Sequence, residues 1–345
     1  LLAFFFYLWL WPQAPVAGND TNPYLDIARD LRDFRLDEFH VRAPGYPWLL
    51  MLTGSAEAPN RLLFTIQLGA YLGVTGLAAW LLRRAGLGWG LVGLFAAFAL
   101  LPYNVMPAAK ALTETQAQVL LLLGLGLLAL WLNRGGWAGL LLAAACLAVL
   151  GVTRPTFQAF SLGLALLLAL AAIFIAPWRR RLLIGAAGLS VLAGLIIGGL
   201  GWHNLRYHEY FGTTPLFGLN LTQKTARVLE LLPEEYARTR EVLMRYRDQS
   251  LLSFEDAHQF YNYVWEIPMD ELRPRDGMSY AEISAYYTRM NLLLIAKAPL
   301  SYIQEVGYSL ANTFLPVTNV LSHFQSAVLQ AAWTGAHYLT LMVFF

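Results

Sequence analysis

The sequence has little charge and almost no cysteine. Asp, Glu, Lys and Arg make up 13% of the 345 residues, and 57% of the residues are hydrophobic. Soluble domains carry about 25% charged residues, so this composition excludes a soluble globular protein and indicates an integral membrane protein. The one cysteine, Cys146, lies within an apolar run, which excludes disulfides within the chain and cysteine metal sites.

The chain also lacks the features of a nucleic-acid-binding protein. Its formal net charge is +2, and no cluster of Lys and Arg alternates with aromatic residues. The sequence gives no clear metal site, because His40, His203, His208 and His258 lack a helical ligand spacing with acidic residues. Aromatic residues are abundant instead: 11 Trp, 17 Tyr and 19 Phe fit a chain with many membrane–water interfaces.

Apolar runs of about 17–25 residues, long enough to cross a bilayer as helices, recur along the chain. We place the apolar runs at residues 1–12, 61–82, 88–106, 115–132, 137–153, 157–177, 182–202 and 326–345. The first is too short to span and begins at Leu1 without Met, and the last reaches Phe345 without a polar flank. We therefore expect a chain that is incomplete at both ends. The predicted fold class is all-α, a polytopic transmembrane helix bundle with a mainly helical extracytoplasmic loop domain.

The short connections between the runs set the orientation. Alternate connections carry Arg83–Arg84, Arg134 and Arg179–Arg181, which are six basic residues without an acid. The positive-inside rule places these connections in the cytoplasm, and all 22 acidic residues then fall in segments that face outward. We expect a multi-pass protein of the inner (plasma) membrane whose functional face is periplasmic or exterior.

Two outward-facing segments are large. Residues 13–60 contain a predicted helix from Pro23 to Phe34, followed by the stretch RAPGYPWLL (42–50), which we expect to be extended and rigid. Residues 203–298 form a polar segment that is predicted to be mainly helical. Both segments lie on the acidic, extracytoplasmic side.

The larger outer segment carries two helix-start signals. Glu234 and Glu235 lie in the first turn of one predicted helix, where the helix dipole favours acids. Ser279 stands three residues before Glu282, which is a capping-box signature. The helix that follows is amphipathic and is expected to lie along the membrane surface. The chain is thereby divided at residues 1–202 (transmembrane module), 203–298 (extracytoplasmic domain) and 299–345 (interfacial helix and a further transmembrane segment).

Two acidic residues stand at outer ends of apolar runs. Asp20 follows the first run and Glu114 opens the fourth. In a purely structural interpretation, Asp20 is an N-cap and Glu114 is a first-turn acid favoured by the helix dipole. Basic groups reach the same face, and each alone would be explained by snorkelling to the interface. These basic groups are Arg42, Lys110, Arg154, His203 and Arg206.

Together these groups indicate chemistry. The positive-inside rule gives no reason for cations at several helix ends on the outer face. Cations at the bilayer surface suit a lipid-linked phosphate, and a carboxylate beside them suits a general base or a metal ligand. The cations would neutralise a leaving phosphate while the carboxylate acts on the incoming nucleophile. This combination predicts glycosyl transfer from a lipid carrier.

Several motifs in order carry a resemblance. They are DTNPYLDIARDL from Asp20, RAPGYPWLLML, ALTET, TRP, LRYHEYFGTTPLFGLNL and NLLLIAKAPLSYI, spread over most of residues 13–316. With this set the chain resembles the GT-C-fold membrane glycosyltransferases of the protein O-mannosyltransferase and aminoarabinose transferase type. It departs from the family where Asn19 and Thr21 flank Asp20 in place of an acidic pair, and where Tyr207 follows Arg206 in place of Asn.

The resemblance implies an enzyme. The donor would be a polyprenyl-phosphate-linked sugar, transferred with inversion to an acceptor hydroxyl outside the cytoplasm. Asp20 takes the family's position of catalytic base, and Glu114 matches an acidic position at the fourth helix. Use of a divalent metal is left open. Arg42, Arg154 and Arg206 match basic positions of the family that we assign to the donor phosphate. We add Lys110 to the phosphate-binding residues and predict substrate binding by Tyr24, Tyr46 and His203.

Alternatives remain open. The same helices would also suit a catalytically silent subunit that binds a lipid or a glycan, whereas a transporter is disfavoured because the charges lie at the ends of the runs and not within them. The acceptor is left open between protein, lipid and glycan. Two spatial predictions follow: Asp20 and Glu114 face one cavity at the outer surface, and residues 203–298 form a helical cap over it.

Overall fold

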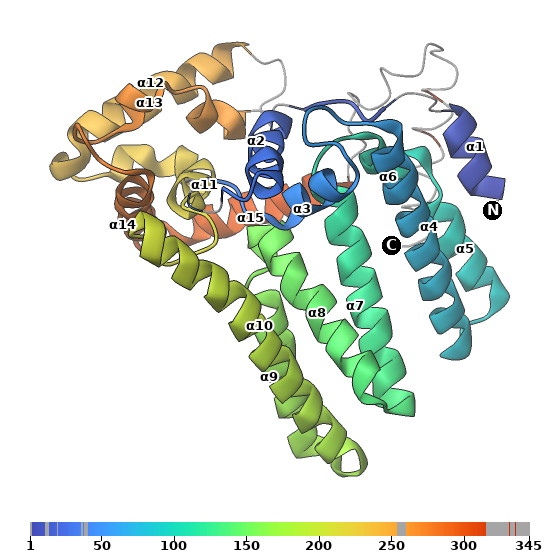
Figure 1. The fold of residues 1–345 in the computed structure, drawn as a ribbon. Coiled ribbons are helices and arrows are strands. Elements are labelled where there is room, and N and C mark those ends of the chain that lie inside the picture. Colours follow the sequence, from blue (N-terminus) through green and yellow to red (C-terminus); the bar gives the residue numbers. More distant parts are fainter. Residues whose placement is uncertain are drawn as a thin grey trace. The chain divides into compact units, whose positions relative to one another are not determined.

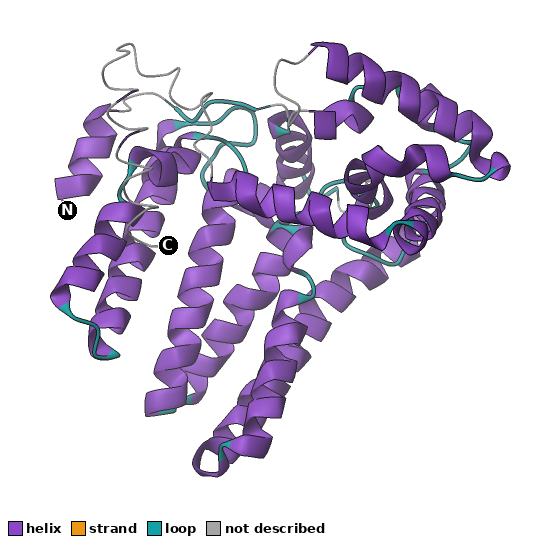
Figure 2. Cartoon of the chain, turned by 180° about the vertical axis from the view of Figure 1, so that it is seen from behind, coloured by secondary structure: helices purple, strands orange, loops and turns teal. Residues whose placement is uncertain are grey.

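The computed structural model describes residues 2–10, 14–18, 20–35, 37, 41–253 and 260–314, and the single positions 331 and 335. Within these residues the regular elements are helices, and the one extended pairing is an isolated bridge between Val16 and Lys110. Figure 2 shows the same pattern, with helices joined by short loops. The predicted all-α fold class is confirmed.

The chain divides into two compact units. The first comprises residues 1–213 together with 316–345, and the second comprises residues 214–315. The first unit contains the long apolar helices and every residue to which the sequence assigns a catalytic or binding role.

The helices of the first unit follow one another in the order α1 Leu2–Leu10, α2 Thr21–Arg32, α3 Gly45–Leu52, α4 Arg61–Arg84, α5 Trp89–Ala99, α6 Pro102–Val105, η1 Met106–Ala109, α7 Glu114–Arg134, α8 Trp137–Thr153, η2 Pro155–Phe157, α9 Phe160–Phe174, η3 Ala176–Trp178 and α10 Arg179–His208. In Figure 1 the helices α4, α5, α7, α8, α9 and α10 extend away from the end of the unit that carries α2 and α3.

Among the described residues, four helical segments are long and apolar enough to cross a bilayer. These segments are Arg61–Arg84, Glu114–Arg134, Pro155–Phe174 and Ala176–His208. Four such segments in one chain indicate a multi-pass integral membrane protein, as the composition predicts.

Other predicted spans differ from expectation. The membrane-crossing helix predicted at 88–106 is wrong, because α5 has only 11 residues, a rise of about 16 Å. Pro102 accounts for the break, since a proline lacks an N–H and disfavours helical backbone at the residue before it. The helix α8 has the predicted bounds but only 17 residues, at the lower end of the spanning range. The span predicted at 326–345 lies outside the described residues apart from positions 331 and 335.

The helices α7, α8, α9 and α10 share one hydrophobic core. Its buried large side chains include Trp131, Leu140, Leu147 and Leu189. Gly124 allows α7 to approach α8 closely, because an added Cβ there would lie 2.7 Å from Leu147 Cγ. Small residues at such contacts are the usual means of close helix packing in membranes.

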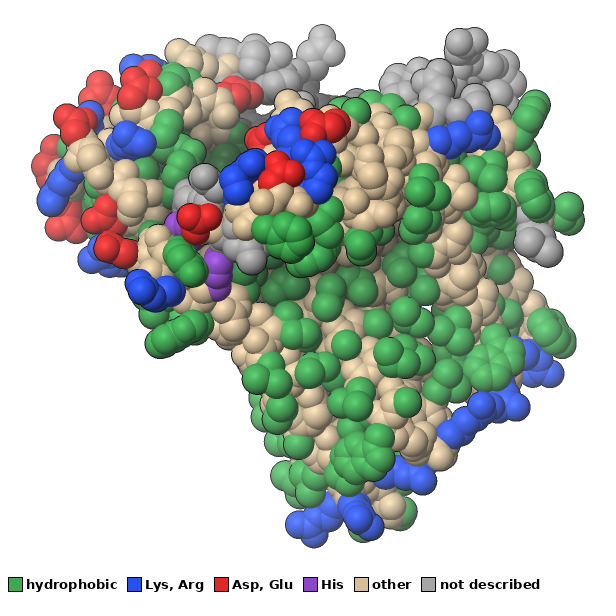
Figure 3. Space-filling model, in the orientation of Figure 1, with side chains coloured by type: hydrophobic (Ala, Val, Ile, Leu, Met, Phe, Trp, Pro, Cys, Tyr) green, Lys and Arg blue, Asp and Glu red, His purple; other side chains and the backbone are tan. Residues whose placement is uncertain are grey.

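Charge and apolar surface are segregated on the first unit. Leu141, Leu167 and Ile173 are exposed by 57%, 62% and 71% on the sides of the helices, as expected of surfaces that face lipid. Figure 3 shows hydrophobic side chains along the helices and Lys or Arg at their lower ends. Between residues 61 and 208 the one acidic residue is Glu114, which opens α7 at the opposite end.

The segment RAPGYPWLL is not extended, contrary to the sequence-based expectation. Its residues from Gly45 onward form α3, and the N–H of Trp48 donates to the carbonyl of Pro44 at 3.1 Å. Pro47 lies in the first turn, where a helix has no use for an N–H donor, so proline is tolerated there. Gly45 packs directly on the end of α8, where an added Cβ would lie 2.5 Å from Thr153 Oγ1.

The second unit contains α11 Phe217–Thr225, η4 Ala226–Leu231, η5 Glu234–Tyr236, α12 Ala237–Ser253, η6 Phe260–Trp265, α13 Met269–Leu272, α14 Tyr280–Lys297 and α15 Pro299–Phe314. The pairing of α11 with α14 forms its centre. The fully buried Asn291 donates to the carbonyl of Gly218 at 3.0 Å and to Thr222 Oγ1 at 2.8 Å, which joins the two helices.

The predicted capping box at the start of α14 is confirmed. The N–H of Glu282 donates to Ser279 Oγ at 3.3 Å, and the N–H of Ser279 donates to Glu282 Oε2 at 2.8 Å. Glu234 and Glu235 occupy a short 3₁₀ turn directly before α12. The expectation that α14 lies along the membrane surface stays a prediction, as does the expectation that residues 203–298 cover the site.

Candidate functional site

Asp20 occupies the N-cap position of α2 but does not act as a cap. Its side chain makes no capping hydrogen bond. Instead Arg42 Nη2 donates to Asp20 Oδ1 at 2.6 Å, in a pair whose side chains are 24% (Arg42) and 50% (Asp20) exposed. Asp20 Oδ2 makes no hydrogen bond to any other described residue. A purely structural role as a helix cap therefore does not explain the position of the Asp20 carboxylate.

A short pairing holds Asp20 next to the segment that precedes α7. The N–H of Val16 donates to the carbonyl of Ala109 at 2.8 Å, and the N–H of Ala111 donates to the carbonyl of Val16 at 3.0 Å. Thr21 Oγ1 then donates to the carbonyl of Ala111 at 3.0 Å. These bonds bring the first outer loop to within three residues of Glu114.

Glu114 forms the second acid–arginine pair. Its Oε1 lies 3.2 Å from Arg154 Nη1, which comes from the end of α8. Beside this pair are buried oxygens that have no hydrogen-bond partner among the described residues: Glu114 Oε2, Thr115 Oγ1, Gln116 Oε1 and Thr153 Oγ1. Gln116 Nε2 donates to the carbonyl of Gly45 at 3.1 Å, so the starts of α3 and α7 meet the end of α8 here. Buried unpaired oxygens are rare in proteins and mark a place for water or a ligand.

Tyr24 lies beside the Asp20–Arg42 pair. It is 7% exposed, and the guanidinium of Arg42 lies 6.0 Å from its ring centre. Burial raises the pKa of the Tyr24 hydroxyl, Arg42 opposes this rise, and the carboxylates of Asp20 and Glu114 add to it. Because one hydroxyl is influenced by both acids, Asp20 and Glu114 belong to the same neighbourhood.

Tyr46 supports this neighbourhood from inside. Its ring meets that of Tyr24 edge to face at 5.6 Å. Tyr46 is fully buried, and burial raises the pKa of its hydroxyl. That hydroxyl donates to Gln67 Oε1 at 3.1 Å, and Gln67 Nε2 donates to the carbonyl of Ala108 at 2.8 Å. The chain of bonds fixes both tyrosines against α4.

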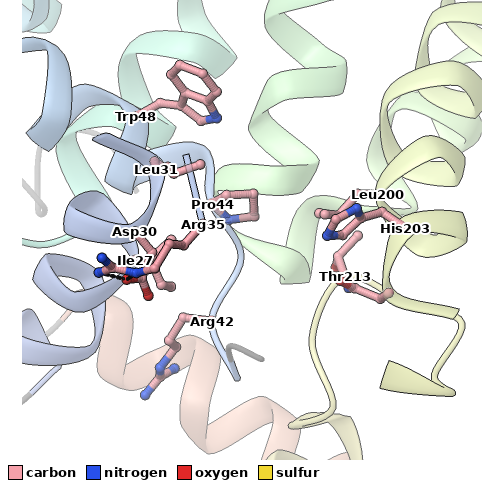
Figure 4. Close-up of a pocket in the computed structure, with 11 residues that line it drawn as sticks. Ile27, Asp30, Leu31, Arg35, Arg42, Pro44, Trp48, Leu200, His203 and Thr213 are labelled. Carbon is pink, nitrogen blue, oxygen red and sulfur yellow. Dashed lines mark hydrogen bonds and ion pairs between the residues drawn. The ribbon is translucent and has the colours of Figure 1, made fainter. Parts of the chain in front are cut away.

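A cavity of about 230 Å³ opens beside Arg42. Arg42, Arg35 and Asp30 line one side of it, and His203 and Thr213 line the other (Figure 4). Arg35 Nε donates to Asp30 Oδ1 at 2.9 Å. The polar part of the cavity is therefore cationic on balance and includes a histidine.

Most of the other residues that line this cavity are apolar: Ile27, Leu31, Pro44, Trp48 and Leu200. They lie among the polar residues, with Leu200 beside His203 in Figure 4. In Figure 4 Trp48 and Arg42 lie at opposite ends of the α3 side. Thr213, which is 3% exposed, has a hydroxyl without a hydrogen-bond partner among the described residues. A cavity lined by two arginines and several apolar side chains suits an amphiphile with an anionic head.

The other predicted site residues lie apart from this cavity. Neither Asp20 nor Glu114 lines it, and Asp20 reaches it through Arg42. The carbonyl of Lys110 accepts from Gln67 Nε2 at 3.3 Å, so its backbone belongs to the neighbourhood of Tyr46. Arg206 is exposed near the end of α10 and is not a lining residue. The roles assigned to all of these residues stay predictions.

Sequence reasoning missed part of the site. Trp48 and Thr213 line the cavity, and Gln116 and Thr153 contribute unpaired oxygens beside Glu114. Thr153 precedes Arg154 in the motif TRP, and Gln116 directly follows the motif ALTET, so both positions carried a usable signal. Nothing in the sequence distinguishes Thr213 from its neighbour Thr214.

Metal binding has no ready site in the described part of the chain. No three side chains of His, Cys, Asp or Glu come together there closely enough to hold a metal ion. His40 and His258 lie outside the described residues. The question of a divalent metal, open from the sequence, is not decided by this finding.

The site thus belongs to a multi-pass, all-helical membrane protein and contains the pairs Asp20–Arg42 and Glu114–Arg154. No protein family, no curated protein and no solved structure matches the chain. The resemblance to GT-C glycosyltransferases therefore stays a prediction from the motifs.

Proposed function

We propose that the protein is an inverting membrane glycosyltransferase that takes a sugar from a polyprenyl-phosphate carrier. The observation that carries this proposal is the contact between Asp20 and Arg42. It couples a carboxylate, one oxygen of which has no hydrogen-bond partner among the described residues, to a guanidinium that lines a cavity with cationic and apolar side chains. Such a cavity fits a phosphate head and the start of an isoprenoid chain.

Arg42 has donors for both roles. A guanidinium carries five N–H donors in a planar fork, and the bond to Asp20 uses one nitrogen, Nη2. The remaining donors are available for phosphate oxygens on the cavity side. Arg154 stands in the same relation to Glu114, so a second cation–carboxylate pair is present in the same neighbourhood.

In the proposed reaction this chain supplies the base and the cation that faces the leaving phosphate. The acceptor hydroxyl oxygen attacks the anomeric carbon of the sugar and forms the new glycosidic bond. The bond between that carbon and the phosphate oxygen breaks on the opposite face, and its electron pair leaves with polyprenyl phosphate. The hydroxyl proton passes to Asp20 Oδ2, and Arg42 neutralises the leaving phosphate. Glu114 is the alternative base.

The proposed location follows from charge. The arginine-rich ends of the helices face the cytoplasm under the positive-inside rule, so the site faces the periplasm or the exterior of the inner (plasma) membrane. Residues 203–298, which by the same rule lie on this side, are proposed to form a helical cap over the site. The acceptor, whether protein, lipid or glycan, would enter from there.

The test is transfer by purified protein. Polyprenyl phosphate carrying radiolabelled glucose, mannose or arabinose is supplied with membrane extract as the acceptor source, and release of free polyprenyl phosphate is measured. Loss of a general base lowers rates about 10²–10⁴-fold, so Asp20→Asn should lose turnover by that factor while still binding the donor. Asp26→Asn is the matched control, because Asp26 lies on the same helix and pairs with Arg29 at the exposed surface.

Each outcome is informative. Near wild-type turnover by Asp20→Asn would move the base to Glu114. Donor binding by the wild-type protein without turnover under any of these conditions would favour the alternative, a silent subunit that binds a lipid or glycan. Absence of donor binding would overturn the proposal.

A further inference from the structure

A second cavity lies at the other end of the first unit. Its volume is about 760 Å³, and it is lined by α4, α5 and α7. No candidate site residue lines it. It is the end of the unit at which the visible charges in Figure 3 are Lys and Arg.

The wall that α7 contributes is a continuous helix face. Leu122, Leu125, Gly126, Ala129, Leu130, Asn133 and Arg134 line the cavity, with the spacing of three and four residues that places side chains on one face of a helix. Twelve residues along α7 correspond to about 18 Å. This length is close to the thickness of one hydrocarbon leaflet, about 15 Å. The groove therefore has the dimensions of a lipid chain that lies along the helices.

The mouth of this groove is cationic. The guanidinium of Arg84 lies 5.0 Å from the ring centre of Trp80, and that of Arg134 lies 5.9 Å from the same centre. Both arginines line the cavity. Neither forms an ion pair within the described residues, and the sequence from 61 to 208 has no acid except Glu114 at the opposite end of α7.

Two cations gathered on one ring repel each other unless an anion lies between them. The last turn of a helix favours a cation, which explains one arginine at the end of α4 and one at the end of α7. This preference of helix ends does not explain why the cavity next to the two arginines is lined mainly by Leu and Ala. A phosphate head between the guanidinium groups, with an acyl chain in the groove, satisfies both features.

We propose that this groove binds an anionic glycerophospholipid of the cytoplasmic leaflet, with its phosphodiester at Arg84 and Arg134. This inference does not depend on the glycosyltransferase proposal, because it concerns another site at the other membrane surface. Each basic residue near an anionic membrane surface contributes about 1 kcal/mol, which is about fivefold in affinity. Both arginines together then raise the affinity for an anionic lipid about 30-fold.

The experiment measures lipid binding to the full chain in detergent. Native mass spectrometry and the shift in unfolding temperature are recorded with phosphatidylglycerol, phosphatidylcholine and polyprenyl phosphate as separate probes. We expect phosphatidylglycerol to bind and stabilise, and phosphatidylcholine to do so far less. The double variant Arg84→Gln, Arg134→Gln should bind phosphatidylglycerol about 30-fold more weakly, and Ala129→Phe, which fills the groove, should also weaken it.

The control removes the same charge elsewhere on this membrane surface. Arg179 and Arg180 are exposed and do not line the groove, so Arg179→Gln, Arg180→Gln should bind phosphatidylglycerol like the wild type. Equal loss in both double variants would reduce the effect to general charge attraction and overturn the proposal. If polyprenyl phosphate bound to this groove more tightly than phosphatidylglycerol, the proposal would also be overturned, and the carrier lipid would be the occupant. No binding of phosphatidylglycerol to the wild type would overturn the proposal directly.

Discussion

Gly45 packs so closely on the end of α8 that a methyl group added at this position has a clear expected consequence. In Gly45→Ala the new Cβ would lie 2.6 Å from the carbonyl oxygen of Val152 and 2.7 Å from Thr153 Cα. Both are backbone atoms and cannot turn aside as a side chain would. Reaching the ordinary contact distance of 3.4 Å to that oxygen requires a displacement of about 0.8 Å between α3 and α8.

The displacement affects both stability and activity. Extra volume in a packed contact costs about 1–3 kcal/mol, equivalent to a fall of several degrees in unfolding temperature. Arg42 precedes α3 and Arg154 follows α8. A shift between these helices therefore also moves the Asp20–Arg42 pair away from the Glu114–Arg154 pair. A misplacement of about 1 Å lowers catalytic rates about 10²-fold, and we expect a loss of 10- to 100-fold in sugar transfer.

Unfolding is followed with a thiol-reactive fluorophore, since Cys146 is the one cysteine and lies in α8. The matched control is Gly76→Ala in α4, where an added Cβ meets nothing within 4 Å. That variant should be unchanged or more stable by up to about 1 kcal/mol, because alanine has the higher helix propensity. If Gly45→Ala unfolds and turns over like Gly76→Ala, then α3 does not hold the site together.

Three further outcomes are expected. Glu114→Gln removes a half-exposed pair with Arg154, so unfolding should change by less than about 1 kcal/mol while transfer falls at least about tenfold; a parallel loss of both would make the pair structural. Arg206→Ala should raise the KM for the donor more than it lowers kcat, and an unchanged KM would remove Arg206 from the donor site. Hydrogen bonds from Ser279 lower the pKa of Glu282 below its ordinary 4.5. A lowered carboxyl pKa stabilises above that value and is lost as the pH falls through the lowered one, so Glu282→Gln should unfold earlier than wild type at pH 7 and converge with it in acid; a constant difference from pH 7 to 2 would contradict this.

Features with local signals could be predicted from the sequence. The capping box of α14 depends on Ser279 and Glu282, three positions apart, and it formed as expected. The long apolar helices depend on composition over about 20 residues, and α4, α7 and α10 begin or end within a few residues of the predicted runs. The wrong prediction of an extended segment at residues 42–50 had a local cause as well. Two prolines in PGYP suggested extended chain, although one proline precedes α3 and the other lies in its first turn.

The partners within the site could not be predicted. The sequence indicates that Asp20, Glu114, Arg42 and Arg154 come to one membrane face, but not which acid meets which arginine. That pairing depends on contacts between distant segments, such as the bonds between Val16 and residues 109–111. No local pattern encodes such bonds, because they join backbone groups about 93 positions apart and the bonded residues, Val16, Ala109 and Ala111, are small and apolar.

Arginine has opposite surroundings at the two ends of the first unit, and this difference bears on how long a phosphate would stay. At the outer end Arg42 and Arg154 each contact a carboxylate, so an incoming phosphate shares its cation with a competitor of like charge. Binding there is weakened and release is eased, as turnover requires of a product. At the other end Arg84 and Arg134 contact a tryptophan and no acid within the described residues, so a bound phosphate has no competitor. A lipid in the groove should therefore copurify with the protein, whereas the carrier lipid at the outer site should exchange within a catalytic cycle.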